Sequence, residues 1–302
     1  MNTPRPCGCK GKRSCLICEE DYSIQPPAAT SLSDIIYDYC HQCGEAWTCP
    51  GENLSVEVQH PQHSGSSIPF PGVYIQQNFL SESEKQQLLD GINNEPWSLS
   101  QSGRRKQNYG PRCNFKKMKI QKRDFNGFPK FSKFVHEKFQ DVPILNNYKV
   151  IEQCVLEYDP NRGASIDPHI DDCWIWGERI VTVNVLGDTF LTFTKYSGDR
   201  QRYNLNYLDT YSSDLIHKLD GNDKYASEVN CEDGFKVRVF MPEKSLIVLF
   251  GSARYEWEHF IPREDIKSYR LCVAYREFSP PYLNGDFRDI GNEIQEIGQQ
   301  FW

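Results

Sequence analysis

Apolar and β-branched residues gather in short extended runs after Tyr148, whereas before Tyr148 the apolar residues recur at helical spacing. Helical patterns therefore precede the strands instead of alternating with them. This order predicts an α+β fold, in which an antiparallel β core carries helices packed on one side. The predicted strands span residues 149–158, 179–185, 190–194, 235–240, 245–250 and 269–278.

Local signals predict three helices. Ser81 and Glu84 have the spacing of a capping box, which predicts a helix that begins there and ends at about Gly91 or Asn93. A second helix is predicted from Pro129, and a third near the C-terminus, where it docks on the body. The residues expected to face inward are Leu88, Leu89 and Ile92 in the first helix, Phe128, Phe131, Val135 and Phe139 in the second, and Ile290, Ile294, Ile297 and Phe301 in the third.

The length of 302 residues suits one large domain, or one domain with a small appendage. We assign residues 1–67 to a Cys-rich N-terminal segment and linker, and residues 68–302 to the globular domain, with an insertion at about 195–234. The longest apolar run, residues 246–250, is too short to span a membrane, so we expect no membrane partner. No apolar secretory signal is visible at the start, and we expect a protein of the cytoplasm and nucleus.

The chain contains twelve cysteines, which we expect to be thiols or metal ligands rather than disulfides. Four of them lie close together near the N-terminus, where glycines allow tight turns. Four thiolates at this spacing can close a structural zinc site, although a redox-labile thiol cluster or surface cysteines would share the pattern. A second set has three thiols, which a histidine would complete. The first set is Cys7, Cys9, Cys15 and Cys18, and the second is Cys40, Cys43 and Cys49 with His41, His60 or His63.

His169 and Asp171 lie two residues apart in an extended segment, so their side chains point to the same face. Such a pair also arises by chance, and a loop pair bonded to the backbone would look the same. His259 follows ninety residues later, just after a predicted strand. Two imidazoles and one carboxylate can hold Fe(II) and leave positions open for a cosubstrate and dioxygen.

Arg270 and Arg276 are six residues apart on a predicted strand, so they share one face. Two inward arginines on an apolar strand are unfavourable unless each meets an anion. A dicarboxylate such as 2-oxoglutarate offers two, and arginine binds carboxylates bidentately. The alternative is an exposed strand face with surface salt bridges.

The order of His-x-Asp, a distant His and then Arg-x5-Arg resembles the AlkB-type Fe(II)/2-oxoglutarate-dependent dioxygenases. Tyr158 fits the position of a tyrosine that touches the cosubstrate in that family, whereas Leu156 stands where the family has an asparagine. Further segments resemble one branch of the family over nearly the whole chain, with an interruption at 195–234. These segments are Cys-Gly-Cys-Lys-Gly at 7–11, Cys-Leu-Ile-Cys-Glu at 15–19, Leu-Ser-Gln-Ser-Gly-Arg-Arg-Lys-Gln at 99–107 and Trp-Gly-Glu-Arg at 176–179.

This resemblance implies a double-stranded β-helix, or jelly-roll, core. It implies that Arg270 pairs with the distal carboxylate of 2-oxoglutarate, and that Arg276 faces the other carboxylate or orients Asp171. The implied reaction uses dioxygen to oxidise an N-methyl group, with release of formaldehyde and succinate. The implied site residues are His169, Asp171 and His259 for Fe(II), and Tyr158, Arg270 and Arg276 for 2-oxoglutarate.

A basic stretch from Pro96 to Arg123 has nine lysines and arginines and no acidic residue. AlkB relatives carry a lid over the substrate there, and the mixed cations, amide and aromatics predict substrate contacts. They could bind phosphates and stack a flipped base, or meet an acidic protein, and a solvated basic loop is the alternative. The predicted substrate residues are Tyr109, Arg112 and Asn114, together with Phe115.

Three functions remain open from the sequence. The resemblance implies demethylation of monomethyl-lysine in a protein, with actin or another actomyosin component as the substrate. Demethylation of N6-methyladenine in DNA is the second. The third is a zinc-dependent protein-interaction adaptor with little turnover, which Leu156 and the N-terminal cysteines motivate.

Overall fold

Two seven-stranded sheets form the body of the protein in a computed structural model that describes residues 5–25, 35–48, 59–210 and 234–302. Apolar side chains from both sheets meet in one shared core. Sheet A has the order β10 (Ile166–His169), β15 (Trp257–Ile261), β12 (Thr189–Lys195), β13 (Lys236–Met241), β1 (Ile36–Cys40), β2 (Glu45–Thr48) and β3 (Ser67–Pro69). Sheet B has the order β4 (Val73–Gln76), β14 (Ser245–Leu249), β11 (Trp176–Leu186), β16 (Arg270–Phe278), β9 (Glu152–Tyr158), β6 (Arg105–Tyr109) and β5 (Ser98–Leu99).

Neighbouring strands in these sheets pair antiparallel, except that β1 runs parallel to β13. The six strands predicted after Tyr148 are all present as β9, β11, β12, β13, β14 and β16. Strand β15, which carries His259, was not predicted, and β10 lies in the segment around His169 that was expected to be extended. Four or five residues are too few to give a clear period. The expected jelly-roll architecture is confirmed.

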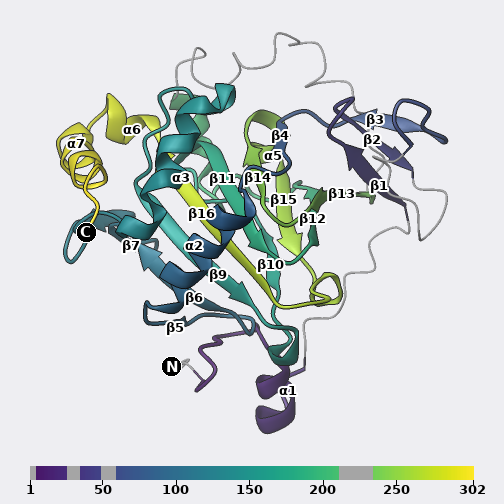
Figure 1. Ribbon diagram of the computed structural model, residues 1–302, viewed down its shortest axis with the longest axis horizontal. Helices are drawn as coiled ribbons and strands as arrows, with labels where there is room; N and C mark the ends of the chain where they lie inside the picture. The colour runs from purple at the N-terminus through teal and green to yellow at the C-terminus, as the bar shows by residue number, and fades with distance from the viewer. Residues whose placement is uncertain (1–4, 26–34, 49–58, 211–233) are drawn as a thin grey trace.

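Helices cover the outer face of sheet B, as predicted (Figure 1). Helix α2 (Glu82–Asn93) begins with the expected capping box, in which Ser81 Oγ accepts from the Glu84 N–H. The helix predicted from Pro129 is broken into a 3-10 turn and α3 (Lys133–Lys138). The remaining α-helices of the described residues are α1 (Leu16–Tyr22), α5 (Gly251–Tyr255), α6 (Pro280–Leu283) and α7 (Arg288–Ile297). None of the helices in the described ranges has the length and apolar character to cross a membrane.

Polar contacts join these helices to sheet B. Gln107 Nε2 on β6 donates to the carbonyl of Ile92 at 2.8 Å, and Ser132 Oγ donates to Gln153 Oε1 on β9 at 2.9 Å. These contacts identify the face of sheet B that carries odd-numbered residues of β6 and β9 as the helix side. The opposite face therefore turns toward sheet A.

The segment interpreted as linker contains strands of sheet A, and this corrects the prediction. Strand β1 pairs with β13, and Arg238 on β13 donates two hydrogen bonds of 2.7 and 2.9 Å to the Asp38 carboxylate on β1. Strands of four or five residues around a polar turn leave no sustained hydrophobic period, so the sequence did not reveal them. The boundary at residue 67 stays a prediction.

The insertion predicted at 195–234 is described only as far as residue 210. Its first part contains the 3-10 turn η6 (Leu205–Thr210) and lies against the loop after β10, where Asn204 Nδ2 donates to Asp172 Oδ1 at 2.7 Å. Residues 211–233 lie outside the described residues.

Candidate active site

The three predicted iron ligands meet at the edge of sheet A. Strand β10 carries His169 and strand β15 carries His259, and the two residues are direct partners in the antiparallel pairing. Their rings are 4.3 Å apart, and His259 Nε2 lies 3.5 Å from Asp171 Oδ2. One ligand atom from each residue lies within 4.8 Å of the others. Strand pairing thus brings together residues that are ninety positions apart.

In His169 and in Asp171, hydrogen bonds occupy one side-chain atom and leave another to face this point as a metal ligand. His169 Nδ1–H donates to the carbonyl of Asp167 at 2.9 Å, which leaves Nε2 as the ligand atom. Arg276 Nε donates to Asp171 Oδ1 at 2.7 Å. The other carboxylate oxygen, Oδ2, accepts no hydrogen bond within the described ranges. A buried carboxylate oxygen without a donor is an unfavourable arrangement that a cation would relieve.

The protonation states also suit a cation. Burial lowers the pKa of His169 and of His259, so both imidazoles are neutral near pH 7. Burial alone would raise the pKa of Asp171, but the charge of Arg276 outweighs it and holds that pKa well below its usual range. Two neutral imidazoles and one carboxylate are the donor set of non-haem Fe(II) sites with open positions. The residues therefore fit Fe(II).

Arg270 lies across the core from these ligands, in sheet B. Its side chain is 1% exposed, and its guanidinium carbon is 4.8 Å from the centre of the Tyr158 ring. Neither Nε nor Nη1 has a hydrogen-bond partner among the described residues. Burying a guanidinium without an anion is costly, and its N–H groups suit a carboxylate. This position fits one end of 2-oxoglutarate.

Arg276 uses two of its three guanidinium nitrogens on protein carboxylates. Nε bonds Asp171, and Nη1 donates to Glu152 Oε2 at 2.7 Å. Of the two roles considered for this residue, the contacts favour the one in which it orients Asp171.

Arg104 joins this site without having been singled out in the sequence. Its guanidinium lies 5.7 Å from the centre of the Tyr158 ring, which Arg270 also contacts. The neighbouring Arg105 points to the helix side and pairs with Glu157, with Nε 2.6 Å from Oε2. Strand alternation along β6 would have separated the two arginines, but the five consecutive polar residues 104–108 hide which face is buried.

The predicted substrate residues lie in two places. Tyr109 is on the helix side of sheet B, where its hydroxyl donates to Gln107 and its ring is 6.2 Å from that of Trp302. Together with Arg112 it lines a pocket of about 240 Å³. Tyr109 faces the helices and not the three predicted iron ligands, because it lies two residues from Gln107 on β6 and so shares its face. Arg112 and Asn114 are exposed on β7 (Arg112–Asn114).

Strands β7 and β8 (Lys119–Gln121) form a separate hairpin. Phe115 at its turn lies 6.1 Å from Trp174 and 6.5 Å from Trp176, measured between ring centres. Trp176 in turn lies against Arg276, at 5.4 Å. The exposed side of this hairpin carries Arg112, Asn114, Phe115, Lys116, Lys117, Met118 and Lys119.

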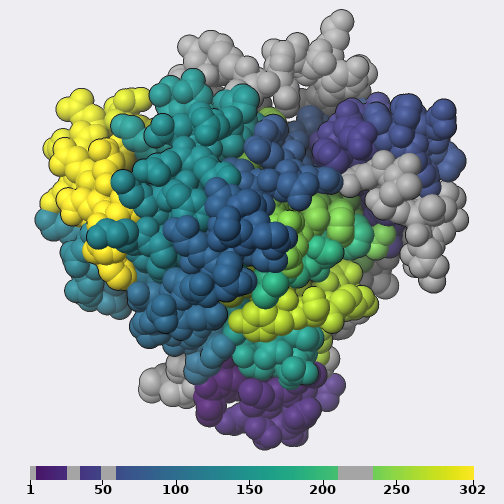
Figure 2. Space-filling view, in the orientation of Figure 1, coloured from purple at the N-terminus to yellow at the C-terminus, as the bar shows by residue number. Residues whose placement is uncertain are grey.

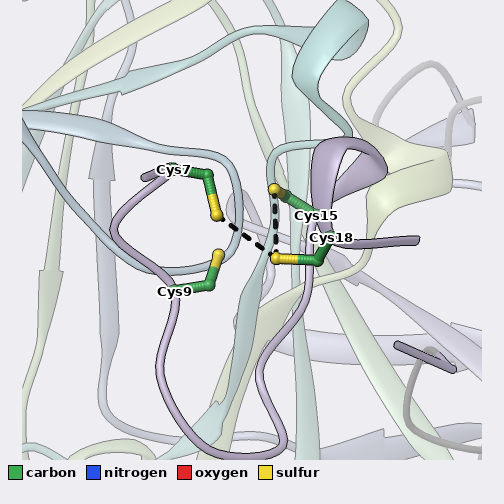
Figure 3. A group of neighbouring side chains, drawn as sticks. All are labelled: Cys7, Cys9, Cys15 and Cys18. Carbon is green, nitrogen blue, oxygen red and sulfur yellow. Dashed lines mark hydrogen bonds between the residues drawn. The ribbon is translucent and has the colours of Figure 1, made fainter. Parts of the chain in front are cut away.

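The N-terminal cysteines form a second cluster (Figure 3). All four are buried free thiols, with Sγ of Cys18 3.2 Å from that of Cys7 and 3.7 Å from that of Cys15. A tetrahedron of four thiolates around zinc has edges of about 3.8 Å, since each Zn–S bond is about 2.3 Å. The residues fit Zn²⁺.

This Cys₄ cluster is held against strand β10, which carries His169. Arg13 Nε, within the cluster's loop, lies 2.9 Å from Asp167 Oδ2, and Asp167 also holds His169 through its carbonyl. On the other side, Arg263 Nη2 lies 2.7 Å from Glu19 Oε1. Figure 2 shows the cluster's segment as a lobe at one end of the molecule.

Comparisons with known proteins agree with this geometry. No family model matches the sequence. The chain is 36% identical over 299 residues to the human alpha-ketoglutarate-dependent dioxygenase alkB homolog 4, covering 98% of this chain and 94% of that protein. The chain belongs to the AlkB family of dioxygenases. It is also 29% identical to a Caenorhabditis elegans protein named DNA N6-methyl adenine demethylase, over 97% of this chain and 94% of that one.

A solved structure of OsALKBH1 is 12% identical, with a TM-score of 0.39, and covers 69% of this chain and 99% of that one. The branch resemblance inferred from the sequence motifs is confirmed by the matches to human and mouse alkB homolog 4, each 36% identical. As an AlkB-family dioxygenase, the chain uses Fe(II), 2-oxoglutarate and dioxygen. Membership favours the enzyme over the adaptor.

Proposed function

We propose that His169, Asp171 and His259 bind Fe(II), that Arg270 and Tyr158 bind 2-oxoglutarate, and that the enzyme oxidatively demethylates an N-methyl group. With its cosubstrates, iron of this kind supplies the oxidation of an unactivated C–H bond. The observation that carries the proposal is that Asp171 Oδ2 and, separately, the buried Nε and Nη1 of Arg270 have no hydrogen-bond partner among the described residues. Formaldehyde and succinate are the expected products.

The residues of the protein position the metal ligands and the cosubstrate and keep them away from water. Arg276 fixes one oxygen of Asp171, and the Asp167 carbonyl fixes the His169 ring, so both ligands are oriented before the metal binds. Arg270 is preset for a carboxylate because it lies on a rigid central strand of sheet B. The core around these groups excludes water.

We propose monomethyl-lysine in a protein such as actin, or another actomyosin component, as the substrate. The hairpin of β7 and β8 supports this, because its exposed cations match an acidic protein surface and Phe115 offers an apolar contact. The 36% identity to alkB homolog 4 agrees with the motifs from which this substrate was expected.

Demethylation of N6-methyladenine in DNA is a second candidate. The printed name of the Caenorhabditis elegans relative favours it, and so does the exposed Phe115 among lysines, since an aromatic ring can stack a base while cations bind phosphates.

A side-by-side assay separates the two substrates. The iron-loaded enzyme is supplied with 2-oxoglutarate and either a monomethyl-lysine actin peptide or an N6-methyladenine oligonucleotide, and formaldehyde is counted. The proposal expects formaldehyde from the peptide, above that from the unmethylated peptide. If only the oligonucleotide yields formaldehyde, the substrate is N6-methyladenine and not monomethyl-lysine. If neither substrate yields formaldehyde, demethylation of both is refuted.

We further propose that the Cys₄ cluster binds a structural zinc ion, which would bring α1 and the Arg13 loop into one unit beside Asp167. The cluster has four protein ligands, as structural zinc sites do. We also propose residence in the cytoplasm and nucleus, which fluorescence of a tagged full chain would test.

A further inference from the structure

The hairpin of β1 and β2 carries a cluster of metal-ligating side chains that is unrelated to the iron site. Cys40 ends β1, Cys43 lies in the turn, and His60 and His63 approach from the segment before β3. One ligand atom from each of the four lies within 4.8 Å of the others. Three thiols and a histidine were one reading of this region, but the structure assembles two thiols and two imidazoles.

The distances match a tetrahedral metal site. Cys43 Sγ is 3.6 Å from His63 Nε2, and Cys40 Sγ is 3.9 Å from His60 Nδ1. A zinc ion with bonds of about 2.3 Å to sulfur and about 2.0–2.1 Å to nitrogen separates such atoms by about 3.6 Å. We propose that Cys40, Cys43, His60 and His63 bind a second structural zinc ion.

Local structure presents these ligands. The turn is closed by a 2.9 Å hydrogen bond from Gly44 N–H to the Cys40 carbonyl, and the positive φ of 76° at Gly44 favours a glycine. Trp47 Nε1–H donates to Cys43 Sγ at 3.5 Å, which favours a thiolate. The Trp47 ring also stacks on His63 at 4.6 Å and fixes its orientation.

The metal would stabilise the hairpin of β1 and β2, which extends sheet A, the sheet that carries His169 and His259. Strand β1 pairs with β13, which pairs with β12, the neighbour of the strand that carries His259. A two-stranded hairpin is marginally stable by itself, so a metal that joins its turn to residues 60–63 would hold it in place. Figures 1 and 2 show this hairpin at a different corner of the molecule from α1, so the two zinc sites are independent.

Metal analysis of the full chain tests the proposal. The protein is purified without a histidine tag, dialysed against a weak chelator, and its zinc content is measured. Two zinc ions per chain are expected, one at each cluster. In a Cys9→Ser/Cys15→Ser background one should remain, and adding Cys43→Ser/His63→Asn should remove it. A content of zero in that background before the last change would overturn the proposal.

Matched controls come from the same region. His41→Asn changes a histidine in the turn that the cluster does not use, and Cys49→Ser changes a thiol outside the described residues. Both should keep the second zinc. Loss of zinc in either control, or its retention in Cys43→Ser/His63→Asn, would refute this ligand set. Cobalt substitution gives a second readout, because thiolate-to-cobalt absorption should fall with Cys43→Ser/His63→Asn but not with His41→Asn.

Discussion

Replacing Arg270 by methionine should abolish tight binding of 2-oxoglutarate without destabilising the protein. Methionine keeps much of the volume but removes the two buried donors, Nε and Nη1, that have no partner among the described residues. Truncating one partner of a buried, hydrogen-bonded charge pair costs about 2–5 kcal/mol. Since each 1.4 kcal/mol is about tenfold, the dissociation constant of 2-oxoglutarate should rise by about 30- to 4,000-fold.

The stability of the ligand-free protein separates binding from folding. Arg270 buries a charge that no carboxylate of the described residues neutralises, so Arg270→Met should leave the free energy of unfolding unchanged or raise it. Arg270→Lys keeps the charge but loses the bidentate geometry, and should weaken binding by a smaller factor, about tenfold. Arg288→Met, at an exposed arginine of α7, is the matched control.

Anaerobic calorimetry of the Fe(II)-loaded variants measures these constants, and thermal unfolding of the same samples measures stability. A change below about threefold in Arg270→Met would refute the assignment of Arg270 to the cosubstrate. Equal losses in Arg270→Met and Arg288→Met would refute it as well, because they would show an effect of net charge alone.

Three further predictions concern other residues. His169→Ala and Asp171→Ala should each abolish formaldehyde production while the melting temperature stays within a few degrees, and turnover like that of the wild type in either would contradict the ligand assignment. Burial raises the pKa of Glu178 to about 7, so its contribution to the free energy of unfolding is complete below pH 4.5 and is lost as the pH rises through 7, by up to about 3 kcal/mol. Urea unfolding at pH 5.5 and at pH 8 should show a smaller loss of stability in Glu178→Gln than in the wild type. An equal loss in the two proteins would contradict this prediction. Cys9→Ser should release one zinc ion per chain, measured by metal analysis, whereas Cys113→Ser, outside both clusters, should release none.

The parts of the site that sequence reasoning located are those governed by local spacing. His169 and Asp171, and likewise Arg270 and Arg276, were expected on common faces because strand periodicity relates them, and the structure brings each pair to the predicted region. The capping box of Ser81 and Glu84 could also be predicted, because it depends on a local spacing of three residues.

The parts that sequence reasoning missed depend on strand phase and on distant partners. The stretch around β6 is polar throughout, so nothing showed that Arg104 faces inward and Tyr109 outward. The pairing of β1 with β13 joins segments about two hundred residues apart, and the contact of Asn204 with Asp172 follows from how the insertion folds back. Such contacts leave no periodic signal.

The central claim is that His169, Asp171 and His259 hold iron. Equilibrium dialysis against Fe(II) under anaerobic conditions, with iron and zinc counted in the same sample, tests it most directly. The wild type should retain one iron per chain, and His169→Ala/His259→Ala should retain none while its zinc content is unchanged. Equal iron in the two proteins would contradict the claim.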